Sequence, residues 1–322
     1  MCTAINYLGN KHLFGRNLDV EVCYIEEVVI TPRNFPLRYK RFPTQREHYA
    51  FIGMATVEQG YPLYYDAANE HGLCMAALNF VGNAVYPKAK KGENALASYE
   101  LIPYLLSTCK TLKEAIPILR NLRLCDLPFN AYLPLSSLHF LLADKRQSLT
   151  IEQTQEGLQL YDNPVGVLTN NPPFPFHMQH LTLFENLTAR EREKGWNFPS
   201  CETAHSRGLG GVGLPGDNSS PSRFIRAAFI KQNARALTGE AEISQFFHIL
   251  GSVEQVEGCV QVQDKWERTQ YTSCIDTKRN IYYYRTYENP SITAVQLTKA
   301  AAQGNELQRF PLKTSLLVHS EN

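Results

Sequence analysis

The chain has 322 residues, and its 32 Lys and Arg stand against 31 Asp and Glu, which gives a formal net charge of +1. This balance argues against a broad basic surface for nucleic acid or for an anionic membrane. The length suits one large domain. We therefore expect a single domain over residues 1–322 that acts on a substrate held locally in a pocket.

The N-terminal segment and the cysteines indicate where the protein works. The first thirty residues contain Lys11, Arg16 and Asp19 and no long apolar run. Neither a signal peptide nor a membrane anchor is predicted, so we expect a cytoplasmic protein. The eight cysteines form no C-x-x-C pair, which argues against a disulfide framework and against a zinc site.

Short segments rich in β-branched and aromatic residues predict strands along the whole chain. They are 2–8, 24–32, 49–56, 62–67, 72–80, 137–144, 148–154, 157–162, 165–170, 271–276, 280–287 and 291–297. The polar turns at 143–148, 153–157 and 276–280 are too short for crossover helices. They predict antiparallel hairpins.

Helical patterns occupy 95–108, 111–122, 219–237 and 242–253. The third has the clearest ends. Ser220 is expected at the N-cap, Pro221 at the first helical position and Gly239 as the stop. Two helix pairs among antiparallel strands predict a layered α+β sandwich, in which each pair covers the outer face of one sheet.

Two motifs have readings that their context does not support. The stretch GVGLPG at 211–216 matches the dinucleotide pattern G-x-G-x-x-G, but it lacks a buried strand before it and a helix directly after it. We interpret it as a mobile or substrate-lining loop. His177 and His180 have a spacing that suits a metal only on a helix, which NPPFPF upstream disfavours. We predict surface histidines and no metal.

Cys2 stands where an N-terminal nucleophile could form. Aminopeptidases generally remove an initiator methionine when the next side chain is small, so we expect loss of Met1 and a free α-amine on Cys2. An α-amine with a pKa of about 7.7 to 8.0 can accept the proton of a thiol with a pKa of about 8.5. Nucleophile and base would then share one residue. The alternative is an ordinary cysteine on a first strand.

Arg16 and Asp19 favour the catalytic reading of Cys2. A guanidinium can stabilise a thiolate, and a carboxylate can bind an ammonium group. If 2–8 and 12–19 form a hairpin, both side chains return close to Cys2; otherwise they belong to a solvated strand end. If the amine is not the base, His71, beside the segment ending at Asn79, is the first conventional candidate.

Eight segments from Cys2 to Val295, taken in order, are similar to the choloylglycine hydrolase family and especially to its bacterial bile salt hydrolases. They are MCTAINY, FGRNLD, NEHGLCMAALNF, GVLTNNP, GLPGDNSSPSRFIRAAF, FFHILGSVE, QYTSCID and IYYYRTYENPSITAV. The resemblance implies an N-terminal nucleophile hydrolase fold with four layers, αββα. It further implies hydrolysis of the C–N amide bond of glycine- or taurine-conjugated bile acids, no cofactor, and a homotetramer.

The resemblance also implies a set of site residues, which are Cys2, Arg16, Asp19, Asn79, Asn170 and Arg223. Cys2 would be the nucleophile, with Arg16 beside the thiolate and Asp19 on the amine. Asn79 and Asn170 would form the oxyanion hole, and Arg223 would complete the polar network. Judged from the residues alone, the asparagines would be turn or strand-end residues and Arg223 an exposed residue of a helix's first turn.

Two alternatives to bile salt hydrolysis stay open at this point. A penicillin V acylase would use the same nucleophile on another amide, and a catalytically silent relative would only bind. A steroid body needs a large apolar pocket. Apolar loop segments around Tyr24, Tyr65 and Phe129 are the expected walls, and ordinary core or surface positions are the alternative reading for them.

Overall fold

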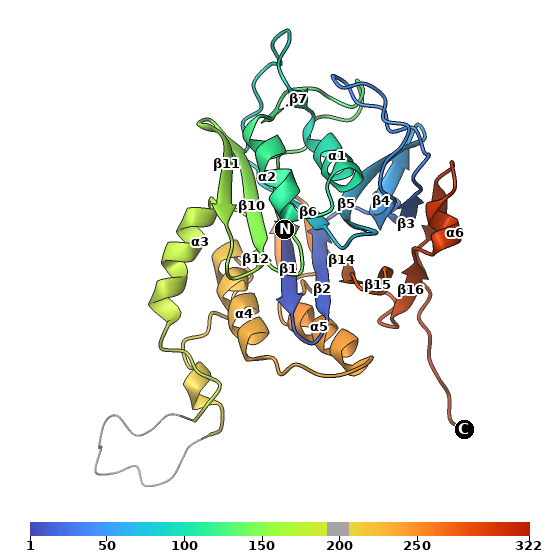
Figure 1. Cartoon of the computed structure of the whole chain (residues 1–322). Helices are drawn as coiled ribbons and strands as arrows, with labels where there is room; N and C mark the ends of the chain where they lie inside the picture. Colours follow the sequence, from blue (N-terminus) through green and yellow to red (C-terminus); the bar gives the residue numbers. More distant parts are fainter. Residues whose placement is uncertain (192–205) are drawn as a thin grey trace.

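The computed structural model describes residues 1–191 and 206–322, and its strands form two stacked sheets (Figure 1). The first sheet has the order β12-β1-β2-β14-β15-β16, with β13 paired to β14. Its strands are β1 Cys2–Leu8, β2 His12–Val20, β12 Val167–Leu168, β13 Val260–Val262, β14 Lys265–Asp276, β15 Ile281–Thr286 and β16 Thr293–Gln296. Each pairing in this sheet is antiparallel.

The second sheet has the order β11-β10-β9-β6-β5-β4-β3-β17 and is also antiparallel. Its strands are β3 Glu27–Thr31, β4 Phe51–Glu58, β5 Tyr61–Asn69, β6 Cys74–Asn79, β9 Leu138–Ala143, β10 Ser148–Thr154, β11 Gly157–Asp162 and β17 Gln308–Pro311. A short parallel pair joins β7 Ala95–Leu96 to β8 Arg123–Leu124. The predicted strands and hairpins are confirmed, whereas β7, β8, β13 and β17 were not foreseen. β7 lies within the segment 95–108 that was predicted as helical, and the α-helix there begins only at Leu101.

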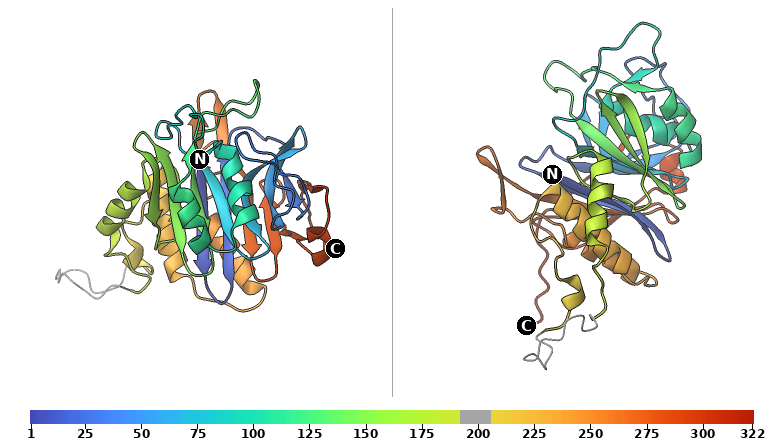
Figure 2. Two further views of the ribbon diagram at one scale, coloured as in Figure 1. Left: turned by 45° about the horizontal axis from the view of Figure 1, so that its top comes forward. Right: turned by 90° about the vertical axis from the view of Figure 1, so that its left-hand side faces the viewer.

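Helices cover the outer face of each sheet, as Figure 2 shows edge-on. The helices α1 Leu101–Thr108 and α2 Leu112–Arg120 pack their leucines on the eight-stranded sheet. The helices α4 Ser220–Asn233 and α5 Ala241–Gly251 pack phenylalanines and isoleucines on the other sheet. The expected αββα order is therefore confirmed.

The helix α4 corrects two of the predicted ends. Its N-cap is Ser219, whose side chain accepts from the Ser222 backbone N–H, because the Ser220 hydroxyl is bonded elsewhere. The helix ends at Asn233, since Ala234 is already extended. Gly239 has a φ of +64° in the turn before α5 and does not terminate α4.

The helix α3 Phe174–Leu181 contradicts the expectation that NPPFPF prevents a helix at His177 and His180. Pro173 is its N-cap and Pro175 its second residue. Prolines are tolerated in a first turn because the backbone N–H groups there have no partner within the helix. The proline run therefore starts a helix.

The remaining elements are short. They are α6 Lys299–Ala302 and the 3₁₀ turns η1 Ser98–Glu100, η2 Thr182–Phe184 and η3 Leu209–Gly211. The loop 211–216 thus follows a 3₁₀ turn and not a strand, as its interpretation as a non-nucleotide loop requires. The cysteines within residues 1–191 and 206–322 are free, and Cys201 lies outside these residues. No helix of the described part is long and apolar enough to cross a membrane.

Candidate active site

The β1–β2 hairpin determines which side chains meet at Cys2. Its register pairs Cys2 with Leu18 and Ala4 with Arg16. Residues directly opposite one another in a sheet point to the same face, so Cys2 and Arg16 both face the second sheet. There Arg16 Nη1 donates to the Ala77 carbonyl at 2.5 Å. The expectation that the hairpin brings Arg16 back toward Cys2 is confirmed.

Arg16 is a fully buried cation. Burial acts to lower its pKa, but the anionic forms of Cys2, Tyr271 and Asp66 outweigh it, so the pKa is raised. Its Nη2 has no hydrogen-bond partner within the described part of the chain. A guanidinium held in this way can stabilise a thiolate on Cys2.

Asp19 lies on the opposite face of β2, because side chains alternate along a strand. The Thr269 hydroxyl donates to Asp19 Oδ1 at 2.6 Å, and Oδ2 lies 3.9 Å from Arg223 Nη1. Burial raises the pKa of Asp19, and Arg223 acts in the opposite direction. Oδ2 accepts no hydrogen bond from the described residues. A buried acceptor without a donor, close to the chain start, is suited to an ammonium group.

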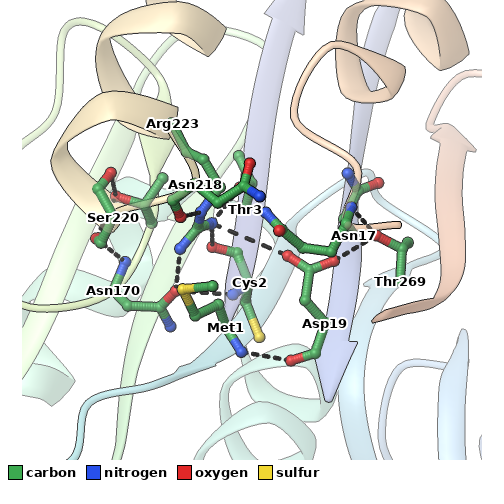
Figure 3. Close-up of polar contacts among 12 residues, drawn as sticks. Met1, Cys2, Thr3, Asn17, Asp19, Asn170, Asn218, Ser220, Arg223 and Thr269 are labelled. Carbon is green, nitrogen blue, oxygen red and sulfur yellow. Dashed lines mark hydrogen bonds and ion pairs between the residues drawn. The ribbon is translucent and has the colours of Figure 1, made fainter. Parts of the chain in front are cut away.

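Arg223 and Asn170 close the polar cluster (Figure 3). Arg223 is fully buried, and its Nη1 donates to the Cys2 carbonyl at 2.5 Å and to Thr3 Oγ1 at 2.7 Å. Asn170 Oδ1 accepts from the Cys2 backbone N–H at 2.7 Å and from Arg223 Nη2 at 2.8 Å. Two donors determine which way the amide faces. The residue-level expectation that Arg223 is exposed is wrong, because the first turn of α4 packs against β1.

Asn79 and Asn170 lie side by side at the ends of β6 and β12. Asn170 Nδ2 donates to the Asn79 carbonyl at 2.7 Å, which leaves its second N–H free. The neighbouring Asn171 donates instead to the Val81 carbonyl at 2.5 Å. The geometry therefore brings Asn170, and not Asn171, to the nitrogen of Cys2.

Met1 stands in front of Cys2 in this structure. Its ammonium group donates to the Asp19 carbonyl and to Glu267 Oε1, both at 2.5 Å. The nitrogen of Cys2 is then a peptide nitrogen, which cannot accept a proton. A cavity of about 210 Å³ opens here. Its lining residues are Met1, Asn79, Val81, Asn170, Asn171 and Ser220.

Several residues of this site carry no signal in the sequence that we used. The Ser220 hydroxyl accepts from the Asn170 backbone N–H at 2.8 Å, and Thr269 and Glu267 contact Asp19 and Met1 as described above. Only the alternation of strand residues around Thr269 could have placed it on the face of Asp19.

His177 was predicted on the surface, and the structure corrects this. It is fully buried, and a hydrogen bond of 2.9 Å joins its Nε2 to the Asn170 carbonyl. Burial lowers the pKa of His177 to about 4, so the ring is neutral near pH 7. His180 is half-buried. Among residues 1–191 and 206–322, no group of three His, Cys, Asp or Glu side chains could hold a metal ion.

His71 does not lie beside Asn79. It belongs to the turn between β5 and β6, whereas Asn79 is the last residue of β6. The two residues are therefore at opposite ends of this strand. The His71 ring packs edge-on against Tyr49, with ring centroids 4.6 Å apart.

The expected walls Tyr24, Tyr65 and Phe129 do not line the cavity of about 210 Å³. The hydroxyls of Tyr65 and Thr56 are hydrogen-bonded at 2.9 Å, and Thr56 also donates to the Tyr24 carbonyl at 2.9 Å. The Phe129 ring packs against Tyr61, with centroids 5.9 Å apart.

The loops at this end of the second sheet nevertheless expose apolar side chains. The loop 21–26 precedes β3, the loop 80–94 follows β6 and the loop 125–137 precedes β9. The pairing of the strands places these three loops at the same end of the sheet. The exposed large apolar residues on them are Tyr24, Ile25, Val81, Val85, Tyr132 and Leu133. Three loops at one end of the second sheet therefore carry exposed apolar side chains.

Comparisons with known proteins agree with this geometry. Residues 2–310 match the family of linear amide C–N hydrolases, choloylglycine hydrolase family. The chain is 45% identical to the bile salt hydrolase/transferase of Lactiplantibacillus plantarum, with 100% of both chains covered. The crystal structure of the C2A mutant of the conjugated bile acid hydrolase from Clostridium perfringens superposes with a TM-score of 0.93, at 34% identity and with 100% of both chains covered.

A more distant structure agrees in fold alone. Penicillin V acylase from Agrobacterium tumefaciens gives a TM-score of 0.76 at 20% identity, over 96% of this chain and 91% of that one. The antiparallel αββα sandwich, the cysteine at the start of β1 and the full-length family match lead to one conclusion. The chain belongs to the choloylglycine hydrolase family of linear amide C–N hydrolases and has the N-terminal nucleophile fold.

Proposed function

We propose that the mature protein hydrolyses the amide bond of glycine- or taurine-conjugated bile acids, with Cys2 as its N-terminal nucleophile. The observation that carries this proposal is the buried Asp19 Oδ2, which accepts no hydrogen bond from the described residues and lies beside a chain start whose next side chain is a thiol near Arg16. The names of the bile salt hydrolase relatives support the choice of substrate.

In the proposed mechanism, removal of Met1 turns the nitrogen of Cys2 into an amine that takes the thiol proton. Asp19 holds the resulting ammonium group, and Arg16 stabilises the thiolate. The thiolate attacks the amide carbon. The side chain of Asn79 and the second N–H of Asn170 donate to the developing oxyanion.

The same groups complete both halves of the reaction. The first half ends when the ammonium group of Cys2 protonates the departing glycine or taurine, which leaves a thioester on the sulfur. A water molecule, deprotonated by the regenerated amine, attacks this thioester and releases the bile acid. Arg223 keeps the Cys2 carbonyl and Asn170 in place through both halves.

The proposed substrate matches the character of the loops at this end. A steroid is a large apolar body, and the loops 21–26, 80–94 and 125–137 carry exposed apolar side chains. Tyr24 and Phe129 lie on two of these loops, and Tyr65 lies one residue before Asp66 on β5. We keep all three as proposed contacts of the steroid outside the small cavity.

The test is a product assay with the purified protein. Glycocholate, taurocholate and penicillin V are offered separately at equal concentration, and the released amine is quantified. We expect faster release from at least one bile salt than from penicillin V. Faster turnover of penicillin V would make penicillin V acylase the function, and no turnover of any of them would favour a binding protein.

We further propose a homotetramer in the cytoplasm, as the family resemblance implies. Light scattering after size-exclusion chromatography measures the mass directly. A mass near 36.5 kDa, that of one chain, would contradict the tetramer.

A further inference from the structure

Asp66 is a fully buried carboxylate that crosses from one sheet to the other. It lies on β5, yet its hydrogen-bond donors belong to β14 and β15 of the facing sheet. The Tyr271 hydroxyl donates to Oδ1 at 2.7 Å, and Ser273 and Tyr282 donate to Oδ2 at 2.9 and 2.8 Å. Burial raises the pKa of Asp66, and Arg16 and the three hydroxyl donors act in the opposite direction. An ionised carboxylate only accepts hydrogen bonds, so three hydroxyl donors suit the charged form.

Arg16 is tied to Asp66 in two ways. Its backbone N–H donates to the Ser273 hydroxyl at 3.1 Å, and that hydroxyl in turn donates to Asp66. Its Nη1 also donates to the carbonyl of Tyr65, the residue before Asp66, at 3.3 Å. The guanidinium and the Asp66 carboxylate also act on one another's pKa through their charges, although no ion pair joins them within the described residues.

A β-bulge makes the second of these contacts available. In the β4–β5 pairing, Met54 lies opposite Asp66 and Ala55 lies opposite Tyr64, so Tyr65 is an extra residue in β5. The extra residue of a bulge is left out of the ladder. The Tyr65 carbonyl is thus directed to Arg16.

Arg16 has no carboxylate within the 4.0 Å limit of an ion pair among residues 1–191 and 206–322. A buried cation needs a compensating anion, because the interior solvates charge poorly. While Cys2 carries its proton, the thiol is neutral and cannot compensate. Asp66 is the buried carboxylate linked to Arg16 through Ser273 and Tyr65.

We propose that Asp66 is the fixed counter-ion of Arg16 and, through Arg16, a positioning residue for Cys2. When Cys2 is a thiol, the Asp66 carboxylate compensates the charge of the Arg16 guanidinium. When Cys2 is a thiolate, the carboxylate and the thiolate both interact with the same guanidinium. Asp66 thereby limits how strongly Arg16 stabilises the thiolate. A thiolate that is stabilised too strongly is a weaker nucleophile. This inference rests on the proposed role of Cys2.

Other charged and titratable groups surround both ends of this arrangement. Besides Arg16, the groups that face Asp66 are Tyr271 of β14, Tyr282 of β15 and Cys74 of β6. The groups around Cys2 are Arg16 and Asp19 of β2, Arg223 of α4, Glu267 of β14 and the chain's own α-amine. Asp66→Asn substitutes none of these groups, but it removes an anion that, in addition to burial, raises the pKa of Tyr271, Tyr282 and Cys74.

The first experiment measures the rate at which iodoacetamide alkylates Cys2 as a function of pH, in Asp66→Asn and in the unsubstituted protein. Mass spectrometry of the N-terminal peptide separates Cys2 from the exposed Cys23 and Cys259. We expect the midpoint of the profile to move to lower pH. At one pH unit below the original midpoint, the rate of Cys2 alkylation should be about threefold higher in Asp66→Asn than in the unsubstituted protein.

The matched control is Tyr282→Phe, which removes a hydrogen bond to Asp66 but no charge. It should leave the midpoint in place even if the protein becomes less stable. An unchanged midpoint in folded Asp66→Asn, or an equal displacement in Tyr282→Phe, would overturn the proposal.

The second experiment needs neither Cys2 chemistry nor substrate, so it separates this proposal from the proposed function. It compares the Tm values of the unsubstituted protein, Asp66→Asn, Arg16→Leu and the double variant at pH 8. Asp66→Asn should lower Tm in the original background. It should raise Tm in the Arg16→Leu background, where Asp66 has lost its cation.

A Tm that falls in both backgrounds would mean that Asp66 only joins the two sheets, and the proposal would be wrong. If Asp66→Asn alone does not fold, the comparison of Arg16→Leu with the double variant still decides the question. A higher Tm for the double variant supports the counter-ion, and a lower one rejects it.

Discussion

Two hollows lie at opposite ends of β5 and β6, and they differ in how their polar groups are satisfied. The larger, of about 510 Å³, is lined by Arg33, His48, Glu70 and His71 among others. Arg33 Nε donates to Glu70 Oε1 at 2.9 Å, and both ring nitrogens of His48 are bonded to backbone carbonyls. These groups already have their partners.

The smaller hollow, of about 210 Å³, lies near two buried charged atoms that make no hydrogen bond within the described residues. They are Arg16 Nη2 and Asp19 Oδ2, and both belong to the surroundings of Cys2. Other buried atoms of the described residues, such as Glu152 Oε2 and Glu242 Oε2, also lack a hydrogen bond, so it is the position of these two beside Cys2 that marks the site. Volume alone therefore does not identify the site.

The largest effect should come from a residue left in front of Cys2. An uncleaved N-terminal extension converts the amine into an amide that cannot accept a proton, so turnover should fall about a thousandfold or more. Steady-state hydrolysis of a bile salt measures it, and mass spectrometry of active protein should show Met1 absent. A tag after Asn322 is the control and should be harmless.

Full activity with a verified extension would remove the N-terminal nucleophile mechanism. It would also remove the contrast between the two hollows, since Asp19 Oδ2, which accepts no hydrogen bond from the described residues, would then have no ammonium group to receive.

Arg223→Ala should lower kcat about a hundredfold, because the Cys2 carbonyl and Asn170 lose their shared donor. It also leaves Asp19 without its cation, so the folded fraction must be checked by circular dichroism. Arg226→Ala is the matched control, since within residues 1–191 and 206–322 the Arg226 side chain donates only to backbone carbonyls, those of Ser252, Pro215 and Asp217. Equal losses of kcat in both variants would assign Arg223 to stability alone.

Arg16→Lys should lower kcat/KM roughly tenfold to a hundredfold. Lysine keeps the charge, but it loses the planar group whose Nε donates to the Asn17 carbonyl while Nη1 donates to the carbonyls of Ala77 and Tyr65. Bile salt hydrolysis measured across a range of substrate concentrations gives this ratio. A variant with unchanged kcat/KM would show that Arg16 acts as a charge only.

The smallest effect is expected in the larger hollow. His71→Ala and Glu70→Gln should each keep activity within about twofold of the original. Glu70→Gln also removes the ion pair with the half-exposed Arg33, which should lower the free energy of unfolding by at most about 1 kcal/mol. Initial rates and thermal unfolding test both statements. A tenfold loss of activity in His71→Ala would restore His71 as a catalytic base.

Much of the scaffold follows from local patterns. The predicted strands match β1, β3 to β6, β9 to β12 and β14 to β16, because period-2 alternation and short polar turns are properties of adjacent residues. The turn at Gly9 and Asn10 also sets the hairpin register that brings Arg16 to the face of Cys2. The N-terminal position of Cys2 needs no structure at all.

Other parts were decided only in three dimensions. The helix α3 was not predicted, because prolines usually interrupt a helix. They are compatible with α3 because they lie at its N-cap and in its first turn. Arg223 was predicted to be exposed, because the residues of its own helical turn do not indicate that β1 packs against it. Ser220 was predicted to be the N-cap, but its hydroxyl accepts a hydrogen bond from the backbone N–H of Asn170, fifty residues earlier in the chain.

Periodicity and position in the chain were enough to predict most strands, the two helix pairs on the outer faces of a sandwich and the cysteine that can become a nucleophile. The tertiary structure decided which polar groups meet. Thr269 reaches Asp19 across 250 residues and Tyr271 reaches Asp66 across 205. The first contact needs the pairing of β14 with β2 within one sheet, and the second needs the stacking of the two sheets. No local pattern encodes which buried side chains meet in either way.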